Sequence, residues 1–160
     1  MKEEILIRAM IEYNKHDPKR IQHLIKVHSL AKTIGILENI DKKDLFILET
    51  AAILHDIGIK VSEEKYGKCS GKLQEKEGPK EAEKMLEKFG YDREVIDRVC
   101  YLIGNHHTYD NIDGIDYQIL VEADFLVNIY EDNLKKESIE NIKNKIFKTK
   151  TGINFIENMY

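Results

Sequence analysis

Apolar residues recur every three or four positions along most of the chain, which is the spacing of a helix that buries one face. No stretch of five residues holds the strict apolar–polar alternation of a half-buried strand. The pattern therefore predicts an all-α protein. The expected helices cover residues 3–15, 18–38, 41–54, 79–90, 92–106 and 117–131, followed by a basic amphipathic helix from about residue 137.

Acidic residues mark the expected helix starts. Asp17 and Pro18 combine an N-cap carboxylate with a proline at the first helical position, where no backbone donor is needed. Asp41, Asp92 and Asp116 stand at the same place before three later helices. We expect each of these side chains to bind the free backbone N–H groups of the turn that follows.

Two segments between helices lack the periodic pattern. Residues 59–78 are polar and contain Gly67, Gly71 and Gly78, so we expect a long functional loop there. Residues 108–116 are rich in turn-forming residues and are expected to connect two helices. If the chain has a binding site, these two segments are the expected source of its specificity.

Length and composition are typical of one folded domain. The chain has 160 residues, of which 42% are hydrophobic and 34% are charged, with only two prolines. Those values favour a soluble helical protein over a disordered one. We expect a single domain over 1–160, with its core at about 18–131, an N-terminal helix at 3–15 and a basic helical segment at 135–160.

Net charge and cysteine content indicate which cellular compartment and which classes of partner to expect. The net charge of −4 argues against binding to a nucleic-acid polymer. Because no long apolar span or leader pattern is present, we expect a cytoplasmic protein with no membrane partner. Cys69 and Cys100 lack a motif spacing and are interpreted as free thiols. A homodimer is left open.

Candidate chemistry begins with the tetrapeptide His55-Asp56-Ile57-Gly58, which closes an apolar run over residues 45–54. On the helical period His55 continues the stripe of Leu48 and Ala52, so its imidazole is expected to face the core. A buried imidazole and carboxylate cost free energy unless they have partners. Gly58 lets the chain turn away and leave such a site open.

Two further polar residues lie on apolar stripes of other helices. His23 shares a face with Val27 and Leu30, and Asp124 shares one with Leu120 and other apolar residues. Taken singly, each could be an ordinary hydrogen-bonded core residue. Taken together with the His-Asp pair, three helices direct potential metal ligands inward, and this favours a metal site.

At these residues the sequence resembles the HD superfamily of metal-dependent phosphohydrolases. The likeness covers residues 20 to about 131, in three motifs: Arg20 to Ala31, Leu54 to Gly58, and Val121 to Asp124. It implies an α-helical bundle around a central metal site. The family's ligands correspond to the following residues: His23, His55, Asp56 and Asp124.

Departures from the family pattern limit what it implies. Gln74 stands where many two-metal relatives have a histidine, so we expect one tightly held ion, any second ion being weak and dependent on His106 or His107. The deoxynucleotidase branch has a glutamate where this chain has Ile59, so that catalytic carboxylate is absent. The Asn105 to His107 run resembles the HD-GYP branch, but too little of its signature is present to support cyclic dinucleotides.

The resemblance implies hydrolysis of a small phosphorylated substrate, expected to be a nucleotide or another phosphate ester. Two imidazoles and two carboxylates suit Mn²⁺, Fe²⁺, Co²⁺ or Zn²⁺, and Mg²⁺ or Ni²⁺ are further candidates in a purified sample. The ion would activate a water and polarise the phosphoryl oxygen. Asp56 is therefore assigned a catalytic as well as a ligating role.

Charged and basic residues around the ligands are candidates for substrate contact. Arg20 and Lys60 are placed to bind phosphate oxygens, with Lys72 as a further candidate, and Lys60 is also assigned a catalytic role. His106 and His107 are candidate general acids, phosphate-positioning groups or additional ligands. Arg20 could instead form a surface ion pair near the start of its helix, and both lysines could be solvated surface residues.

Two alternative functions remain at this point. A diiron HD oxygenase would need a second metal site, which metal counting would detect. A non-catalytic nucleotide-binding or regulatory module on the same scaffold would show no turnover of a phosphate ester in the presence of Mn²⁺.

Overall fold

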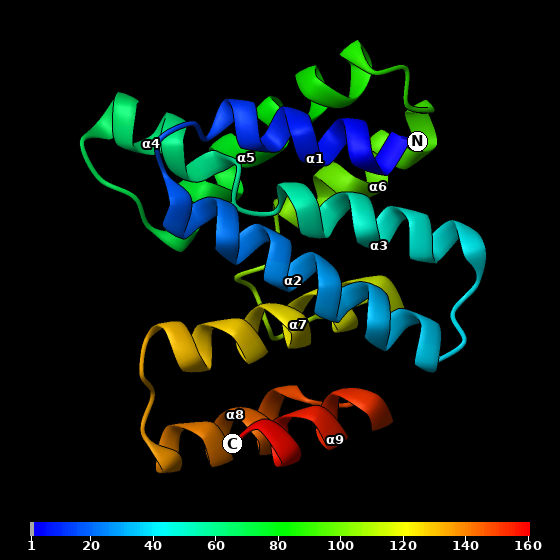
Figure 1. The fold of residues 1–160 in the computed structure, drawn as a ribbon, viewed down its shortest axis with the longest axis vertical. Coiled ribbons are helices and arrows are strands. Elements are labelled where there is room, and N and C mark those ends of the chain that lie inside the picture. Colours follow the sequence, from blue (N-terminus) through cyan, green and yellow to red (C-terminus); the bar gives the residue numbers. More distant parts are fainter. Residues whose placement is uncertain (1) are drawn as a thin grey trace.

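Three helices form the centre of the structure, a computed structural model that describes residues 2–160. Helix α2 (Pro18–Leu37) lies between α3 (Lys42–Leu54) and α7 (Ile115–Glu131) (Figure 1). Their facing stripes are apolar and fully buried, as for Ile34 of α2 and Leu120 of α7. Burial of these stripes is the main favourable contribution to the fold.

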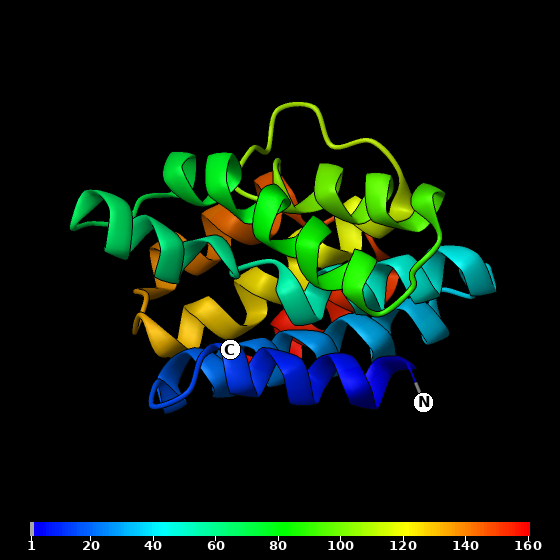
Figure 2. The same ribbon diagram turned by 90° about the horizontal axis from the view of Figure 1, so that it is seen from above.

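Six further helices cover this centre within the described residues. They are α1 (Lys2–Tyr13), α4 (Gly58–Tyr66), α5 (Gly71–Lys88), α6 (Arg93–Ile103), α8 (Lys136–Ile146) and α9 (Lys150–Met159). Helix α1 packs on α2 and α3, the α4–α5–α6 group packs on α3 through α6, and α8 and α9 pack on α7. Figure 2 shows α1 and the α6–α7 connection on opposite sides of the molecule. The all-α prediction is confirmed.

Two of the four predicted N-caps form the expected hydrogen bonds and two do not. Asp17 accepts from the backbone N–H of Arg20, and Asp41 accepts from those of Lys43 and Asp44, as expected. Asp92 occupies the N-cap position but makes no capping hydrogen bond through its side chain. The cap predicted at Asp116 is wrong, because α7 starts at Ile115, two residues before the predicted start, and its N-cap is Gly114 at φ +82°.

Asp116 instead lies inside the first turn of α7 and is buried. Its two carboxylate oxygens accept from the guanidinium of Arg98 at 2.9 and 2.7 Å. Because Arg98 belongs to α6, this pair fixes the α6–α7 connection at its end. An acidic residue in the first turn also favours the helix dipole, which explains why the sequence suggested a cap.

The loop predicted over residues 59–78 is wrong, because these residues form α4 and the first half of α5, with only residues 67–70 between them. The prediction was wrong because glycines in this segment were interpreted as loop residues. Gly58 and Gly78 are the point where the two helices touch, and a Cβ on Gly58 would lie 2.7 Å from the Gly78 nitrogen. Pro79, predicted to begin a helix, lies inside α5.

The basic C-terminal segment forms two helices rather than the one that was expected. A buried carboxylate explains the break: Glu122 of α7 accepts from the backbone N–H groups of Lys148 and Thr149 and from the Thr149 hydroxyl. The bend at residues 147–149 brings the N-terminus of α9 to this charge. The helix dipole favours a carboxylate at that position.

Within residues 2–160, none of the helices combines the length and apolarity needed to cross a membrane. Cys69 and Cys100 are free thiols, as the sequence predicts.

Candidate metal centre

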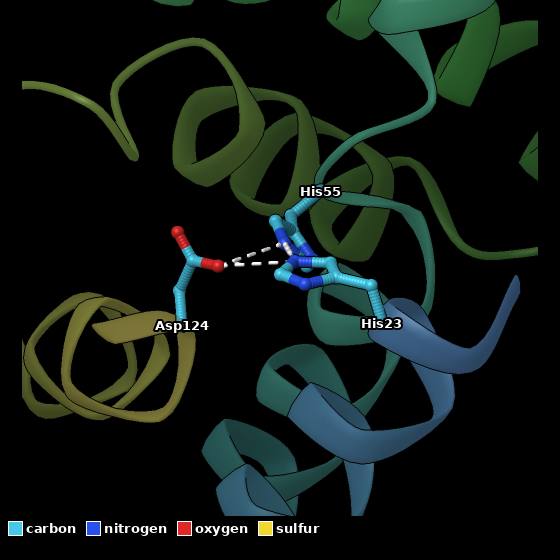
Figure 3. Close-up of side chains that lie close together, drawn as sticks. All are labelled: His23, His55 and Asp124. Atoms are coloured by element: carbon cyan, nitrogen blue, oxygen red, sulfur yellow. Dashed lines mark hydrogen bonds and ion pairs between the residues drawn. The ribbon is translucent and has the colours of Figure 1, made fainter. Parts of the chain in front are cut away.

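Two imidazoles and one carboxylate from three helices meet at the centre of the bundle. His23 of α2, His55 at the end of α3 and Asp124 of α7 point toward one another (Figure 3). The His23 Nε2 atom lies 3.2 Å from His55 Nε2 and 3.1 Å from Asp124 Oδ1. His55 Nε2 lies 3.5 Å from the same oxygen. All three side chains are buried.

Asp56 and His106 extend this cluster. The Asp56 Oδ2 atom lies 3.3 Å from His23 Nε2 and 3.7 Å from His55 Nε2. Its Oδ1 atom lies 3.4 Å from the Nε2 atom of His106, just beyond the end of α6. The structure thus brings the four predicted ligands together and adds a fifth donor. In each of the triads His23–His55–Asp124 and His55–Asp56–His106, the donor atoms lie within 4.8 Å of one another.

Backbone carbonyls set the tautomers of two of these imidazoles. His55 Nδ1 donates to the Ala52 carbonyl at 2.9 Å, and His106 Nδ1 donates to the Ile103 carbonyl at 2.8 Å. Both acceptors belong to the last turn of a helix, where carbonyls have no partner within the helix. With the proton on Nδ1, each imidazole presents the lone pair of its Nε2 atom to the cluster.

In His23, the third imidazole, a side-chain carboxylate instead of a backbone carbonyl sets the same tautomer. His23 Nδ1 donates to Glu131 Oε2 at 2.9 Å, so its Nε2 lone pair also faces the cluster. The Nε2 atoms of neutral His23 and His55 then oppose each other at 3.2 Å with no proton between them. Two facing lone pairs repel each other unless a positive charge lies between them. Either a proton on one of the two Nε2 atoms or a metal ion between them removes this repulsion, so the geometry suits a bound cation.

The charges of the cluster also favour a cation. Burial opposes the charged form of His23, but its hydrogen bond with Asp124 and the charge of Asp56 prevail and raise its pKa to about 9. For His55 the two carboxylates likewise outweigh burial and raise the pKa. Burial alone would raise the pKa of Asp124, but hydrogen bonds from both histidines hold it well below its usual range.

The donor set fits a divalent metal ion. Three imidazole nitrogens and two carboxylates form a mixed nitrogen and oxygen site, which suits Mn²⁺, Fe²⁺, Co²⁺ or Zn²⁺. The Nε2 atom of His106 is buried and has no hydrogen-bond partner among residues 2–160. A buried lone pair without a donor is costly, and coordination to an ion would satisfy it. We conclude that this His/Asp cluster could hold a divalent metal.

A cavity of about 410 Å³ opens beside the cluster. Its wall includes three of the clustered residues, so part of the centre is accessible from solvent. The rest of the wall is mainly polar or charged, with Lys19, Arg20, Gln74, His107 and Asn128 among its members. A small polar ligand could therefore reach the centre.

The predicted substrate residue Arg20 lies in the wall of this cavity. Its guanidinium sits between two carboxylates, 3.4 Å from Asp17 and 3.6 Å from Glu63, and its side chain is only 15% exposed. The ion pair with Asp17 that the sequence allowed is present. Because this pair lies at the cavity, it orients the guanidinium beside the candidate centre.

The structure does not bring the two predicted lysines to the cavity. The Lys60 ammonium donates to the Tyr13 carbonyl at 2.8 Å and lies 5.0 Å from the centre of the Tyr13 ring. Lys60 was expected in a loop, but it lies in the first turn of α4, whose orientation directs it toward α1. Lys72 is exposed in the first turn of α5 and does not line the cavity wall.

His107 borders the cavity on the side of α5. Its Nε2 atom donates to Gln74 Oε1 at 2.9 Å, and its backbone N–H donates to Glu75 Oε1 at 3.1 Å. Burial, with a smaller contribution from neighbouring His106, lowers its pKa to about 4. The imidazole is therefore neutral at pH 7.

The turn that carries His106 and His107 is held by contacts on both flanks. The Tyr117 hydroxyl lies 2.5 Å from the carbonyl oxygens of Asn105 and Thr108. The Thr108 hydroxyl donates to Glu75 Oε1 at 2.9 Å. These bonds tie the turn to α7 and α5, so the histidine pair has a fixed position.

Sequence reasoning missed two polar residues of α7 beside the centre. Asn128 Nδ2 donates to Asp124 Oδ1 at 2.9 Å, and Glu131 accepts from His23. Both face the same side of the helix as Asp124, at spacings of four and seven residues. That spacing was visible in the sequence and could have identified them. Lys19 at the cavity mouth had no signal beyond its position next to Arg20.

A second histidine with two carboxylates lies elsewhere on α2. His28 Nε2 is 3.2 Å from Glu3 Oε1 and 3.7 Å from Glu49 Oε1. The Lys32 ammonium pairs with both carboxylates, at 3.0 and 2.6 Å. This group joins α1, α2 and α3.

Comparisons with known proteins agree with this fold. The family described as HD domain matches residues 20–146. A crystal structure titled as a predicted HD superfamily hydrolase from an uncultured Thermotogales bacterium is 24% identical, with a TM-score of 0.70, and the match covers 97% of this chain and 83% of that one. Bacillus subtilis YpgQ is 22% identical, with a TM-score of 0.67, and the match covers 99% and 88% of the two chains. The search of curated proteins found no match.

Proposed function

The chain belongs to the HD domain family, and from that premise we propose that it is a metal-dependent phosphohydrolase. The proposed reaction is the hydrolysis of a small nucleotide or another phosphate ester by a metal-activated water. The observation that carries the proposal is the convergence of imidazole lone pairs and ionised carboxylates on one buried point beside a polar cavity.

The residues proposed to hold the ion are the four predicted ligands, His23, His55, Asp56 and Asp124, with His106 as a fifth. When bound, a divalent ion at this point would lower the pKa of a water and polarise a phosphoryl oxygen. Asn128 supports the arrangement, because its hydrogen bond fixes the carboxylate plane of Asp124. Ligands oriented in this way bind metal more tightly than free side chains do.

Cationic and neutral groups at the cavity are proposed to bind the phosphate ester. Arg20 is held by its two carboxylate neighbours and can direct two N–H groups at phosphate oxygens. Lys19 adds a second positive charge at the mouth of the cavity. His107 is proposed to position the ester as a neutral hydrogen-bonding group. Because Lys60 and Lys72 do not line the cavity, we assign the phosphate contacts to Arg20 and Lys19.

The contact between Gln74 and His107 favours one tightly held ion. The amide oxygen of Gln74 accepts a hydrogen bond from Nε2 of His107, so this nitrogen offers no lone pair to a metal and only Nδ1 remains as a donor. A second ion at the His106–His107–Asp124 group would have to bind His107 through Nδ1 and would lack the histidine ligand that Gln74 replaces. The diiron oxygenase is therefore the less favoured alternative. A nucleotide-binding module without activity would use the same cavity and remains the second alternative.

Turnover of phosphate esters by the purified chain tests the proposal. We expect release of phosphate or pyrophosphate from at least one member of a panel of nucleotides and sugar phosphates in the presence of Mn²⁺, and no release after chelation. Asp56→Asn should abolish this activity, whereas the matched variant Glu49→Gln, in the second histidine group, should retain it. Nucleotide binding without turnover across the panel would favour the non-catalytic module instead.

A further inference from the structure

His23 differs from the other two histidines of the centre in its position along its helix. His55 and His106 follow the last residues of α3 and α6, where carbonyls three residues earlier are free to accept the Nδ1 proton. His23 is the sixth residue of α2, and the carbonyls near it bond to the helix backbone. Its Nδ1 proton therefore needs an acceptor from another element.

Glu131, the last residue of α7, supplies that acceptor. Its Oε2 atom accepts from His23 Nδ1 at 2.9 Å, and its Oε1 atom pairs with the Lys26 ammonium at 2.5 Å. The Glu131 side chain is only 12% exposed. Its carboxylate is thus held at both oxygens.

We propose that Glu131 is a positioning residue for the metal centre, which fixes the Nδ1–H tautomer and the ring orientation of His23 so that its Nε2 atom binds the ion. The inference rests on the metal centre of the proposed function and not on the identity of the substrate. Lys26 holds the carboxylate of Glu131 from outside, and the chain Lys26–Glu131–His23 reaches from the surface to the centre.

A carboxylate at this position has a larger effect than a carbonyl would have. An ionised acceptor makes a stronger hydrogen bond than a neutral one. It also increases the electron density on the imidazole and so the basicity of the ligating nitrogen. His23 is therefore expected to be the strongest imidazole ligand of the three, although it lies farthest from a free helix end.

Metal affinity separates this positioning role from simple attraction by negative charge. We would titrate the metal-free protein with Mn²⁺ by calorimetry, comparing the wild type with Glu131→Gln, Glu131→Asp and Asp132→Asn. Asp132 follows Glu131 and lines the same cavity, but it is exposed, so its loss removes one charge without touching His23. We expect the first two variants to lose about tenfold to a hundredfold in affinity, and Asp132→Asn to lose less than about threefold.

Glu131→Asp retains the charge but shortens the side chain by one methylene, so wild-type affinity in that variant would overturn the positioning role. An equal loss in Glu131→Gln and Asp132→Asn would also overturn it, because charge alone would then explain the effect. If neither Glu131 variant folds, nitrogen-15 NMR of the wild type loaded with Zn²⁺ decides the question. We expect His23 to bind through Nε2 and to keep a slowly exchanging Nδ1 proton, and binding through Nδ1 would overturn the inference. A wild type that binds no metal would instead contradict the proposed function.

Discussion

Two histidines on α2, five residues apart, show what distinguishes a metal centre from a structural ion-pair group. His23 and His28 are both buried, and each lies within 3.8 Å of at least two carboxylates. Their pKa values nevertheless move in opposite directions. Burial prevails at His28 and lowers its pKa, whereas the carboxylates prevail at His23 and raise its pKa to about 9.

The difference lies in what else approaches the carboxylates. Beside His28, the Lys32 ammonium pairs with both Glu3 and Glu49, so their charge is already balanced. Beside His23, the Lys26 ammonium pairs with Glu131 on the Nδ1 side of the ring, whereas Asp56 and Asp124 on the Nε2 side face imidazoles and form no ion pair with a lysine or arginine of residues 2–160. A buried histidine among acids is therefore weak evidence for a metal. The informative feature is that no lysine or arginine of the described residues pairs with the carboxylates on the Nε2 side.

The largest expected effect comes from removing a carboxylate of the centre. Asp56→Ala should bind no ion and lose at least about a thousandfold in turnover, since a catalytic metal contributes several kcal/mol of transition-state stabilisation. Its melting temperature in the presence of Mn²⁺ should also fall, because bound metal no longer stabilises the fold. Metal analysis, steady-state kinetics and thermal unfolding measure these three effects. Full metal occupancy in this variant would remove the basis of the assignment.

A pair of matched substitutions on α2 tests the comparison itself. His23→Asn should weaken Mn²⁺ binding by at least about a hundredfold, since loss of a ligand exceeds loss of an outer contact. His28→Asn should leave Mn²⁺ affinity unchanged and cost about 1–3 kcal/mol of stability, because it removes a buried group that joins three helices. Calorimetric titration and chemical denaturation of both variants provide the readouts. Equal losses of metal affinity would show that the two groups do not differ as described.

The pH dependence should have opposite signs in the metal-free and metal-loaded protein. In the chelated protein, the raised pKa of His23 adds stability that is complete below pH 6.5 and is lost as the pH rises through about 9. An ion requires the unprotonated Nε2 atom, so Mn²⁺ affinity should rise about tenfold per pH unit over the same window and then level off. Melting curves with and without Mn²⁺ between pH 6 and 9.5 check both signs, and parallel curves would contradict them.

Arg20 should give a smaller effect that is confined to turnover. Arg20→Lys is expected to reduce turnover of the best phosphate ester by more than about tenfold, because an ammonium cannot engage two phosphate oxygens as a planar guanidinium does. Metal content should not change, since the ion pairs of Arg20 are with Asp17 and Glu63, neither of which is a proposed ligand. If Arg20→Ala leaves both kcat and KM unaltered, the ion pair with Asp17 is structural and the phosphate contact must be made by Lys19.

Most of the helices and the meeting of the four candidate ligands were predictable because both follow from the 3.6-residue period. A polar residue on an apolar stripe, such as His23 or Asp124, must face the core, and the family motifs specify which of these residues meet. The helical structure of residues 59–78 was not predictable by the same reasoning. Gly58 and Gly78 were interpreted as chain breakers, but they are small because two helix backbones meet there.

The roles of residues outside the motifs also depended on the fold. The substrate role of Lys60 was inferred from its distance along the chain to Asp56, but the start of α4 turns its side chain toward Tyr13. Conversely, Glu131 was not assigned a role because it is 108 residues from His23 along the chain, yet the two side chains form a hydrogen bond. Contacts between helices of this kind depend on crossing angles that the hydrophobic pattern of one chain does not specify.

A crystal structure of the chain grown with Mn²⁺, with the ion located by its anomalous signal, would decide whether the cluster is a metal centre. We expect one fully occupied ion bound by Nε2 of His23 and His55 and by the carboxylates of Asp56 and Asp124. No ion between these residues, or the main ion bound at His28 between Glu3 and Glu49, would contradict it.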